Sequence, residues 1–182
     1  MFVLKKVRDI MIPLSRYPTI HPEGTLREAV QALRTSYCQL ETGLCTETGP
    51  RSVLVVDHEG NLLGILDFRR ILNLLIPEVA GGLTEKLESL GVSIAFAQAD
   101  AASLDETRAE FNARVIRNAD VQVRDIMLKI RGTVQADATL TQALKLIFRN
   151  KITKLPVFEG KRLVGIVRDT DLFLAVADIL HD

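Results

Sequence analysis

The sequence predicts an α/β (α+β) protein in which two related β-α-β-β-α units pack into one module, with a helical insert between them. Two observations carry this prediction. The pentapeptide VRDIM occurs twice, at Val7–Met11 and at Val123–Met127, and the residues after each copy run in parallel. A long segment without this pattern, residues 77–122, separates the copies. The predicted divisions are therefore residues 1–76, 77–122 and 123–182.

Each copy continues with a predicted helix that begins at a Thr-Leu pair. Thr25 is followed three residues later by Glu28, and Thr139 by Gln142, which is the spacing of a reciprocal capping box. Apolar residues then recur at helical spacing: Leu26, Ala29, Val30 and Leu33 in the first copy, and Leu140, Ala143, Leu144 and Ile147 in the second. Each set forms one buried stripe of an amphipathic helix.

A predicted hairpin follows each helix. The strings VLVVDHEGNLLGIL at 53–66 and KLPVFEGKRLVGIV at 154–167 each contain an apolar strand, a turn with glycine and a second strand with Gly-Ile. A helix start follows in both copies. A unit of about 50–60 residues has only a marginal core of its own, so two such units gain by packing together. We therefore expect a single module with pseudo-twofold symmetry.

The spacing between equivalent positions locates where the copies differ. These positions lie 116 residues apart at the VRDIM strings, 114 at the helix starts and 101 at the Gly-Ile strands. The first copy is therefore predicted to carry 13 additional residues, as a loop insertion at about 37–50. This alignment places Val55 opposite Pro156, and Arg51 opposite Ile152.

The segment between the copies is predicted to contain packed helices. Ser103–Glu106 has the spacing of a capping box, and Leu104, Phe111 and Val115 then share one helical face. We expect residues from about Leu83 to Asn118 to be largely helical and to pack against the two units.

Composition excludes several classes of function. Lys and Arg number 23 and Asp and Glu 23, so no basic field favours nucleic acid or an anionic membrane. The apolar run ILNLLI is too short to span a bilayer, and the first residues lack a signal-peptide pattern, so we expect a cytoplasmic protein. Cys38 and Cys45 are expected to be free thiols. His21, His58 and His181 are expected to be surface residues. No metal or catalytic motif is present, so we expect no enzyme.

The second copy resembles a known family in its longest string, ITKLPVFEGKRLVGIVRDTDL at 152–172. Together with VRDIM and the helix start ADATLTQAL, this string resembles the cystathionine-β-synthase (CBS) domain. The second copy is similar over its whole length, and the first in its opening, its first helix and its Gly-Ile strand. The resemblance implies a tandem CBS pair, or Bateman module. Such modules sense adenine nucleotides in the cleft between repeats and pair as homodimers.

The resemblance also implies a ligand site in the second copy. Two residues at the first strand would lie by an adenine ring, and the Leu-Pro pair would wall its slot. The lysine before this pair belongs to the same site. An aspartate would accept from the ribose hydroxyls, and an arginine would face the phosphates. These residues are Thr133, Val134, Lys154, Leu155, Pro156, Asp171 and Arg168. The chain departs from the family at Arg168, where the family has Ser or Thr, and at Ile152, where it has Gly.

Some site assignments stay open. Asp171 either contacts the ligand or only stabilises the N-terminus of the last helix. In the first copy Asp67 takes the Ser/Thr position and Arg70 the position of the ribose aspartate, so no nucleotide site of the usual kind is expected there. Arg51, Arg69 and Arg70 either bind a polyphosphate or an acidic partner, or are solvated surface residues.

Two functions follow from these observations. The first is a non-enzymatic regulatory module that binds AMP, ADP, ATP or S-adenosylmethionine and needs no other cofactor. The second is a structural CBS scaffold without a ligand, which dimerises or docks on an unidentified protein target. A third hypothesis, an enzyme with an unfamiliar site, is disfavoured by the absence of catalytic motifs.

Overall fold

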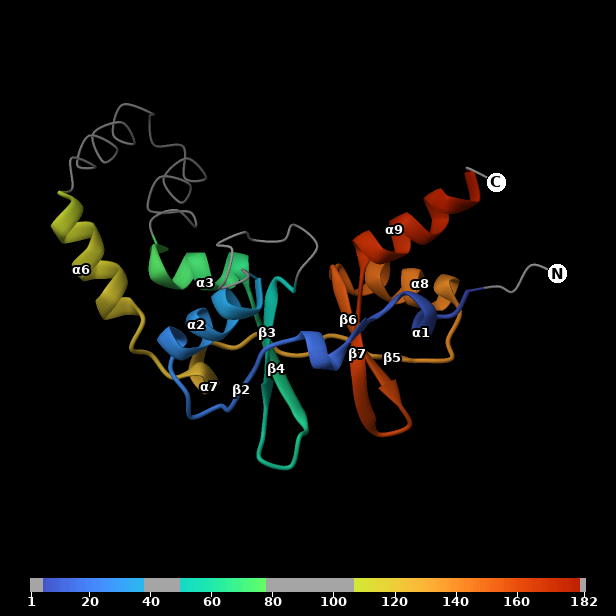
Figure 1. The fold of residues 1–182 in the computed structure, drawn as a ribbon, viewed down its shortest axis with the longest axis horizontal. Coiled ribbons are helices and arrows are strands. Elements are labelled where there is room, and N and C mark those ends of the chain that lie inside the picture. Colours follow the sequence, from blue (N-terminus) through green and yellow to red (C-terminus); the bar gives the residue numbers. More distant parts are fainter. Residues whose placement is uncertain (1–4, 38–49, 78–106, 181–182) are drawn as a thin grey trace, which may run out of the picture.

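The computed structural model describes residues 5–37, 50–77 and 107–180, and it contains the two predicted β-α-β-β-α units side by side (Figure 1). The first unit comprises β2 (Thr19–Ile20), α2 (Leu26–Tyr37), β3 (Ser52–Val56), β4 (Leu62–Asp67) and α3 (Phe68–Leu75). The second comprises β5 (Val134–Gln135), α8 (Leu140–Asn150), β6 (Lys154–Glu159), β7 (Arg162–Arg168) and α9 (Asp169–Ala177), with η3 (Asp178–Leu180) at its end. The predicted fold class is confirmed.

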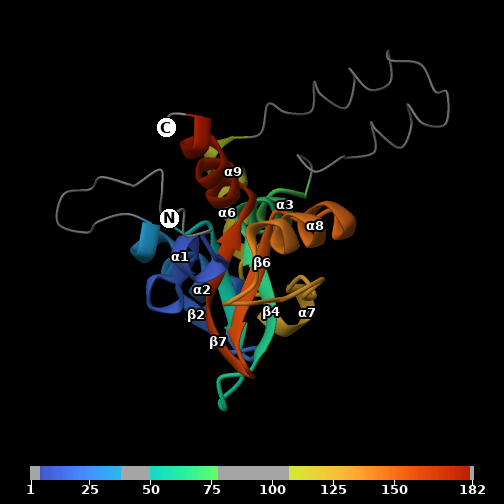
Figure 2. The ribbon, with the colours of Figure 1, turned by 90° about the vertical axis from the view of Figure 1, so that its right-hand side faces the viewer.

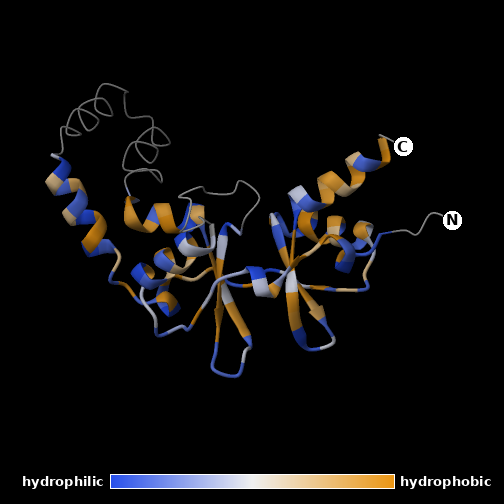
Figure 3. Ribbon diagram, in the orientation of Figure 1, coloured by the Kyte–Doolittle hydropathy of each residue, from blue (hydrophilic) through white to orange (hydrophobic). Residues whose placement is uncertain are grey.

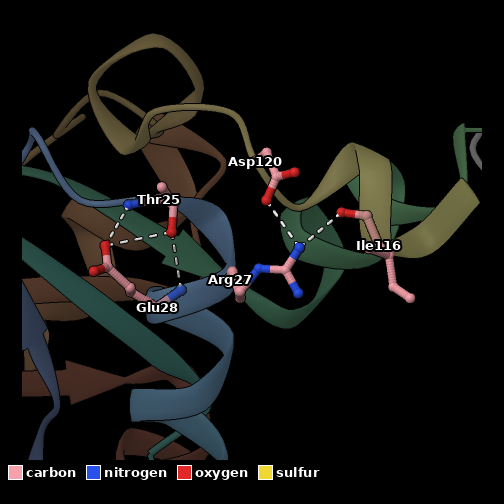
Figure 4. A network of polar contacts seen from close by, with 5 residues as sticks. All are labelled: Thr25, Arg27, Glu28, Ile116 and Asp120. Carbon is pink, nitrogen blue, oxygen red and sulfur yellow. Dashed lines mark hydrogen bonds and ion pairs between the residues drawn. The ribbon is translucent and has the colours of Figure 1, made fainter. Parts of the chain in front are cut away.

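The capping boxes predicted at Thr25 and Thr139 form as expected. In α8 the Thr139 hydroxyl accepts from the Gln142 N–H at 3.2 Å, and Gln142 Oε1 accepts from the Thr139 N–H at 2.9 Å. In α2 the Glu28 carboxylate accepts from the Thr25 N–H at 2.7 Å (Figure 4). These bonds use backbone donors that would otherwise be unsatisfied at the helix start.

The two units have the same sheet arrangement. β3 and β4 pair antiparallel while β2 runs parallel to β3, and β6 and β7 pair antiparallel while β5 runs parallel to β6. Each unit has a buried core between its helices and its sheet. Both hairpins point the same way, with α3 and α9 at the opposite end of the molecule (Figures 1 and 2). The two units are therefore related by the predicted pseudo-twofold symmetry.

The opening segment of each copy packs on the other unit, which the sequence did not predict. The first VRDIM string forms α1 (Val7–Ile10). The backbone N–H of Val7 donates to Ala138 O at 3.0 Å, and Val7 is buried in the core of the second unit. The second string forms α7 (Val123–Ile126), and its Val123 N–H donates to Gly24 O at 2.8 Å in the first unit.

The residues after these helices extend both sheets. β1 (Ile12–Pro13) pairs antiparallel with β7, placing Ile12 opposite Ile166. Leu128, after α7, forms the equivalent antiparallel bridge to Ile65 of β4. The short helix η1 (Leu14–Arg16) then leads from β1 towards β2. Each unit is consequently completed by the other half of the chain.

Strand registers correct the alignment of the two hairpins. Val55 pairs with Gly64 in the first unit, and Val157 pairs with Gly165 in the second, so Val55 is equivalent to Val157 rather than to Pro156. The predicted alignment was wrong by one residue because the first hairpin has a longer turn. The last pair before the first turn is Val56 and Leu62. The equivalent pair in the second hairpin, Phe158 and Leu163, is one residue closer in sequence and is followed by the pair Glu159 and Arg162.

The correction changes which residues correspond across the two units. Leu54 now corresponds to Pro156, and Ser52 to Lys154. Pro50, not Arg51, corresponds to Ile152. Of the 13 additional residues in the first copy, one therefore lies in the hairpin and 12 before it. A shift of one residue reverses the face on which a strand residue lies, so the correction matters for any site on these strands.

The described part of the insert contains the helix α6 (Arg108–Asn118), which starts at Thr107 with a Thr107–Glu110 capping box. Arg27 of α2 donates to Ile116 O at 3.0 Å and to Asp120 at 2.8 Å (Figure 4). α6 is thus attached to the first unit at its C-terminal end. Leu104 and the predicted Ser103–Glu106 box lie outside the described residues, as do Cys38 and Cys45. None of the described helices has the length and apolar character needed to cross a membrane.

Candidate functional site

A cavity of about 510 Å³ lies where the two units meet; we call it the open cavity. The first unit contributes Ile65 and Asp67 at the end of β4. The rest of the lining comes from Leu128–Gly132, which leads into the second unit, and from Lys151–Lys154 and Pro156 around the start of β6. The walls carry an apolar set (Ile65, Leu128, Ile130, Ile152 and Pro156), four basic residues (Lys129, Arg131, Lys151 and Lys154) and one acid, Asp67. This composition suits an anionic ligand with an apolar part.

Lys154 connects the two units at this cavity. Its Nζ donates to Ser52 Oγ at 2.8 Å and lies 3.4 Å from Asp67 Oδ2. Ser52 is 2% exposed and is a buried polar residue at the start of β3. Burial lowers the pKa of Lys154, and the neighbouring carboxylate of Asp67 partly offsets this effect. The ammonium group is therefore held at the seam between the units, within reach of the cavity.

The acid end of the cavity is also the start of α3. Asp67 Oδ1 accepts from the Arg70 N–H at 2.8 Å and so caps this helix. Arg70, the residue equivalent to Asp171 of the second unit, donates from Nε to Ile126 O at 2.9 Å. Arg70 thereby attaches α3 to α7, the helix that opens the second copy and packs on the first unit. The other carboxylate oxygen of Asp67, Oδ2, lies 3.4 Å from Lys154 Nζ, and Asp67 lines the cavity.

The pseudo-twofold axis relates the open cavity to a second place, which we call the counterpart region: Ile12, Tyr17, Leu54, Ile166 and Arg168. Here Ile12 corresponds to Leu128, Leu54 to Pro156, Ile166 to Ile65 and Arg168 to Asp67. The three aliphatic residues belong to one buried cluster that also contains Tyr17, which is 6% exposed. Burial raises the pKa of Tyr17 from 10.0 to about 12, with opposing contributions from Arg168, which lowers it, and Asp171, which raises it.

Both carboxylate oxygens of Asp171 accept hydrogen bonds from Arg168. Its Oδ2 accepts from the Arg168 backbone N–H at 2.9 Å and from Nε at 3.0 Å, and its Oδ1 accepts from Nη2 at 2.7 Å. The side chain of Asp171 is 10% exposed and that of Arg168 20%. These hydrogen bonds raise the pKa of Arg168. The pair therefore combines the capping of α9 with a bidentate ion pair.

The predicted ligand residues of the second unit are divided between several environments. Lys154 and Pro156 line the open cavity. Thr133 follows the lining residue Gly132 and is exposed. Val134 and Leu155 are 6% and 0% exposed and lie in the core of the second unit.

Arg168 and Asp171 lie together in and beside the counterpart region and do not line the open cavity, although Arg168 pairs with Lys154 across β6 and β7. The basic residues Lys129 and Arg131, which the sequence analysis did not select, line the open cavity instead. The sequence feature that could have identified Lys129 and Arg131 is their position directly after the second VRDIM string. In the first unit Arg51 and Arg69 are exposed.

The described histidines form no metal site. His21 and His58 stack with their ring centroids 4.4 Å apart, and His21 Nδ1 lies 3.1 Å from Val56 O. Within the described ranges, no group of three or more His, Cys, Asp or Glu is arranged to hold a metal ion.

Comparisons with known proteins agree with the fold. The CBS domain family model matches residues 7–77 and 123–178. CBSX2 from Arabidopsis thaliana is similar in structure, with a TM-score of 0.62 and 16% identity over 99% of both chains. A putative acetoin utilization protein (AcuB) from Vibrio cholerae has a TM-score of 0.58 and 19% identity over 98% of this chain and 95% of its own. A structure of CBSX2 in complex with AMP has a TM-score of 0.55 and 20% identity over 96% of this chain and 98% of its own.

No curated protein sequence matches the chain. The two segments matched by the family model make up more than half of the chain, and each includes one of the β-α-β-β-α units. The protein therefore belongs to the CBS domain family and is a tandem CBS module.

Proposed function

We propose that the protein is a non-enzymatic regulatory module that binds an anionic ligand of the adenine-nucleotide type in the open cavity. The observation that carries this proposal is the cavity itself, which combines apolar walls with four basic residues at the seam between the units. The AMP complex of a structurally similar CBS protein supports the ligand class.

The chemistry of the walls assigns a part of the ligand to each. Ile152 and Pro156 offer apolar surface to a ring. Lys154 donates to phosphate oxygens, and Asp67 accepts from a hydroxyl group. Because residues of both units line the cavity, a ligand there stabilises the relative arrangement of the two units in which it makes the most favourable contacts. That preference is what a regulatory module transmits.

Titration calorimetry with AMP, ADP, ATP and S-adenosylmethionine tests the proposal. We expect the parent protein to bind at least one of the three nucleotides, and Lys154→Met to bind it roughly ten- to hundredfold more weakly. A hydrogen bond to a charged group contributes about 1.5–3 kcal/mol. Lys145→Met, an exposed lysine on α8, is the matched control and should bind as the parent does. A folded parent protein that binds none of the three nucleotides would contradict the proposal.

The variant Asp171→Ala tests where the ligand lies. If the ribose is held by Asp171, as the family resemblance implies, this variant should lose affinity while Lys154→Met keeps it. If the ligand lies in the open cavity, Asp171→Ala should keep its affinity, because its carboxylate is engaged by Arg168.

A ligand-free scaffold is the second candidate function. It is favoured by two exposed apolar residues, Phe148 on α8, which is 77% exposed, and Phe173 on α9, which is 69% exposed. Under this hypothesis the module dimerises or docks on a protein target without a small molecule. The same calorimetric panel separates the two functions.

A further inference from the structure

The open cavity and the counterpart region are built from equivalent backbone segments, but different side chains lie in them. We propose that the chain's own Tyr17 and Arg168 occupy the counterpart region, so that the protein takes one ligand per chain, in the open cavity. The prediction of one ligand per chain rests on the proposed function. The occupation of the counterpart region by Tyr17 and Arg168 does not rest on it and can be tested separately.

Strand registers establish the equivalence on which the comparison depends. The glycine of each second strand pairs with a valine of the first, and the next residue meets the opening segment of the other copy. Ile65 faces Leu128 in this way on one side, and Ile166 faces Ile12 on the other. Ile65 and Leu128 line the open cavity, whereas Ile12 and Ile166 do not. Ile12 and Ile166 are buried in one cluster with Tyr17, which Ile65 also joins.

Tyr17 reaches this place because the first copy has a longer connection. The segment between the VRDIM string and the first strand is two residues longer there, as the spacings of 116 and 114 residues require. The additional length forms η1, and Tyr17 ends it with its N–H donating to Leu14 O at 2.9 Å. In the second copy the corresponding residues include Gly132, which has no side chain and lines the open cavity.

Arg168 occupies the polar end of the same region. Its guanidinium takes both carboxylate oxygens of Asp171, the acid to which a ligand's hydroxyl groups would donate. On the other side, Asp67 has one oxygen at the helix cap and the other 3.4 Å from Lys154, facing the cavity. A ligand in the counterpart region would have to displace an aromatic ring and break a bidentate ion pair. A ligand in the open cavity meets neither obstacle.

Chemical rescue with phenol tests the occupation without any nucleotide. Tyr17→Gly deletes the ring and leaves a space lined by aliphatic side chains, and such spaces bind small aromatic molecules. We expect millimolar phenol to raise the melting temperature of Tyr17→Gly while leaving the parent and Tyr17→Phe unchanged, because both keep the ring. If Tyr17→Gly does not fold, Tyr17→Ala replaces it. Equal responses of all the proteins to phenol would overturn the proposal.

The number of ligands is measured on the parent protein itself. Calorimetry with the nucleotide that binds best should give one site per chain, and a double variant Tyr17→Ala/Arg168→Thr should gain a second. Two sites per chain in the parent would overturn the proposal. If the parent binds no nucleotide, the proposed function fails, and the phenol experiment still decides whether Tyr17 fills the counterpart region.

Discussion

Tyr17 shows at the scale of one residue how burial couples stability to pH. Its phenol lies among aliphatic side chains, and burial raises its pKa from 10.0 to about 12. The folded protein therefore holds this proton more tightly than the unfolded chain, in which the group ionises near its ordinary pKa. The stabilising contribution is fully present below pH 10 and is lost as the pH rises from 10 to about 12.

We therefore expect the parent protein to lose more stability between pH 10 and 12 than Tyr17→Phe, which has no proton to release. The difference should reach about 2–3 kcal/mol, since one pKa unit corresponds to about 1.4 kcal/mol. Urea unfolding at a series of pH values measures it. Lys154, whose lowered pKa has the opposite sign of effect, is present in both proteins and cancels. Equal losses in the two proteins would show that the phenol is not shielded.

Residue identities in the site were partly predictable from the sequence, and their grouping was not. The Leu-Pro string drew attention to Lys154 and Pro156, and both line the open cavity. The string gave no sign that Lys154 meets Ser52, which is 102 residues away. The family resemblance groups Arg168 and Asp171 with Lys154. Arg168 does pair with Lys154 across β6 and β7, but its guanidinium bonds to Asp171 and does not line the open cavity. A cleft between two units takes its walls from both, and periodicity within one copy cannot reveal such a partner.

At the scale of elements, the Gly-Ile pattern of both copies is explained by close approach. β1 pairs with β7 beside Gly165, where a Cβ atom would collide with the carbonyl oxygen of Ile12. On the other side, a Cβ atom at Gly64 would lie 2.9 Å from Leu128 O and 2.8 Å from Met127 Sδ. Each glycine therefore makes room for the opening segment of the other copy. The repeated glycine was visible in the sequence, but its cause depends on an exchange between distant segments.

Alanine substitution at these glycines should weaken the exchange. We expect Gly165→Ala to destabilise the protein by about 1–3 kcal/mol, the range for inserting a methyl group into a packed site. Gly64→Ala should cost less, because the flexible Met127 side chain can move away from part of the contact. Chemical denaturation measures both, with the exposed turn residue Lys161→Ala as a control expected to lie within about 0.5 kcal/mol of the parent. A Gly165→Ala protein as stable as that control would contradict the explanation.

Local signals account for the elements that the sequence predicted well. The capping boxes at Thr25 and Thr139 involve residues three apart, so their spacing alone identifies where α2 and α8 begin. Apolar strands, a turn with glycine and the Gly-Ile pattern identify the hairpins. Their alignment failed by one residue because a turn can lengthen without any change in the strands beside it.

At the scale of the whole molecule, the second unit ends in an uncovered apolar surface. α9 and η3 are apolar along much of their length, as Figure 3 shows in orange. The exposed side chains here are Phe173 (69%), Leu174 (59%), Val176 (45%), Ile179 (70%) and Leu180 (84%), with Phe148 (77%) on the neighbouring α8. Contiguous apolar surface of this kind marks a site of association in soluble proteins. The string LFLAVADIL predicted such a helix, with more apolar residues than one buried stripe requires.

We expect this surface to pair two copies of the chain, so the parent protein should have the mass of a dimer by light scattering at micromolar concentration. The double variant Phe173→Glu/Ile179→Glu should shift the mass towards that of a monomer, because it would bury charges in the interface. Its circular dichroism should stay that of the folded protein, since both side chains are exposed within one chain. Asn61→Glu lies at the tip of the first hairpin, at the opposite end of the molecule (Figure 1), and should leave the dimer intact. A monomeric mass for the parent would refute the pairing and leave α9 free for a different partner protein.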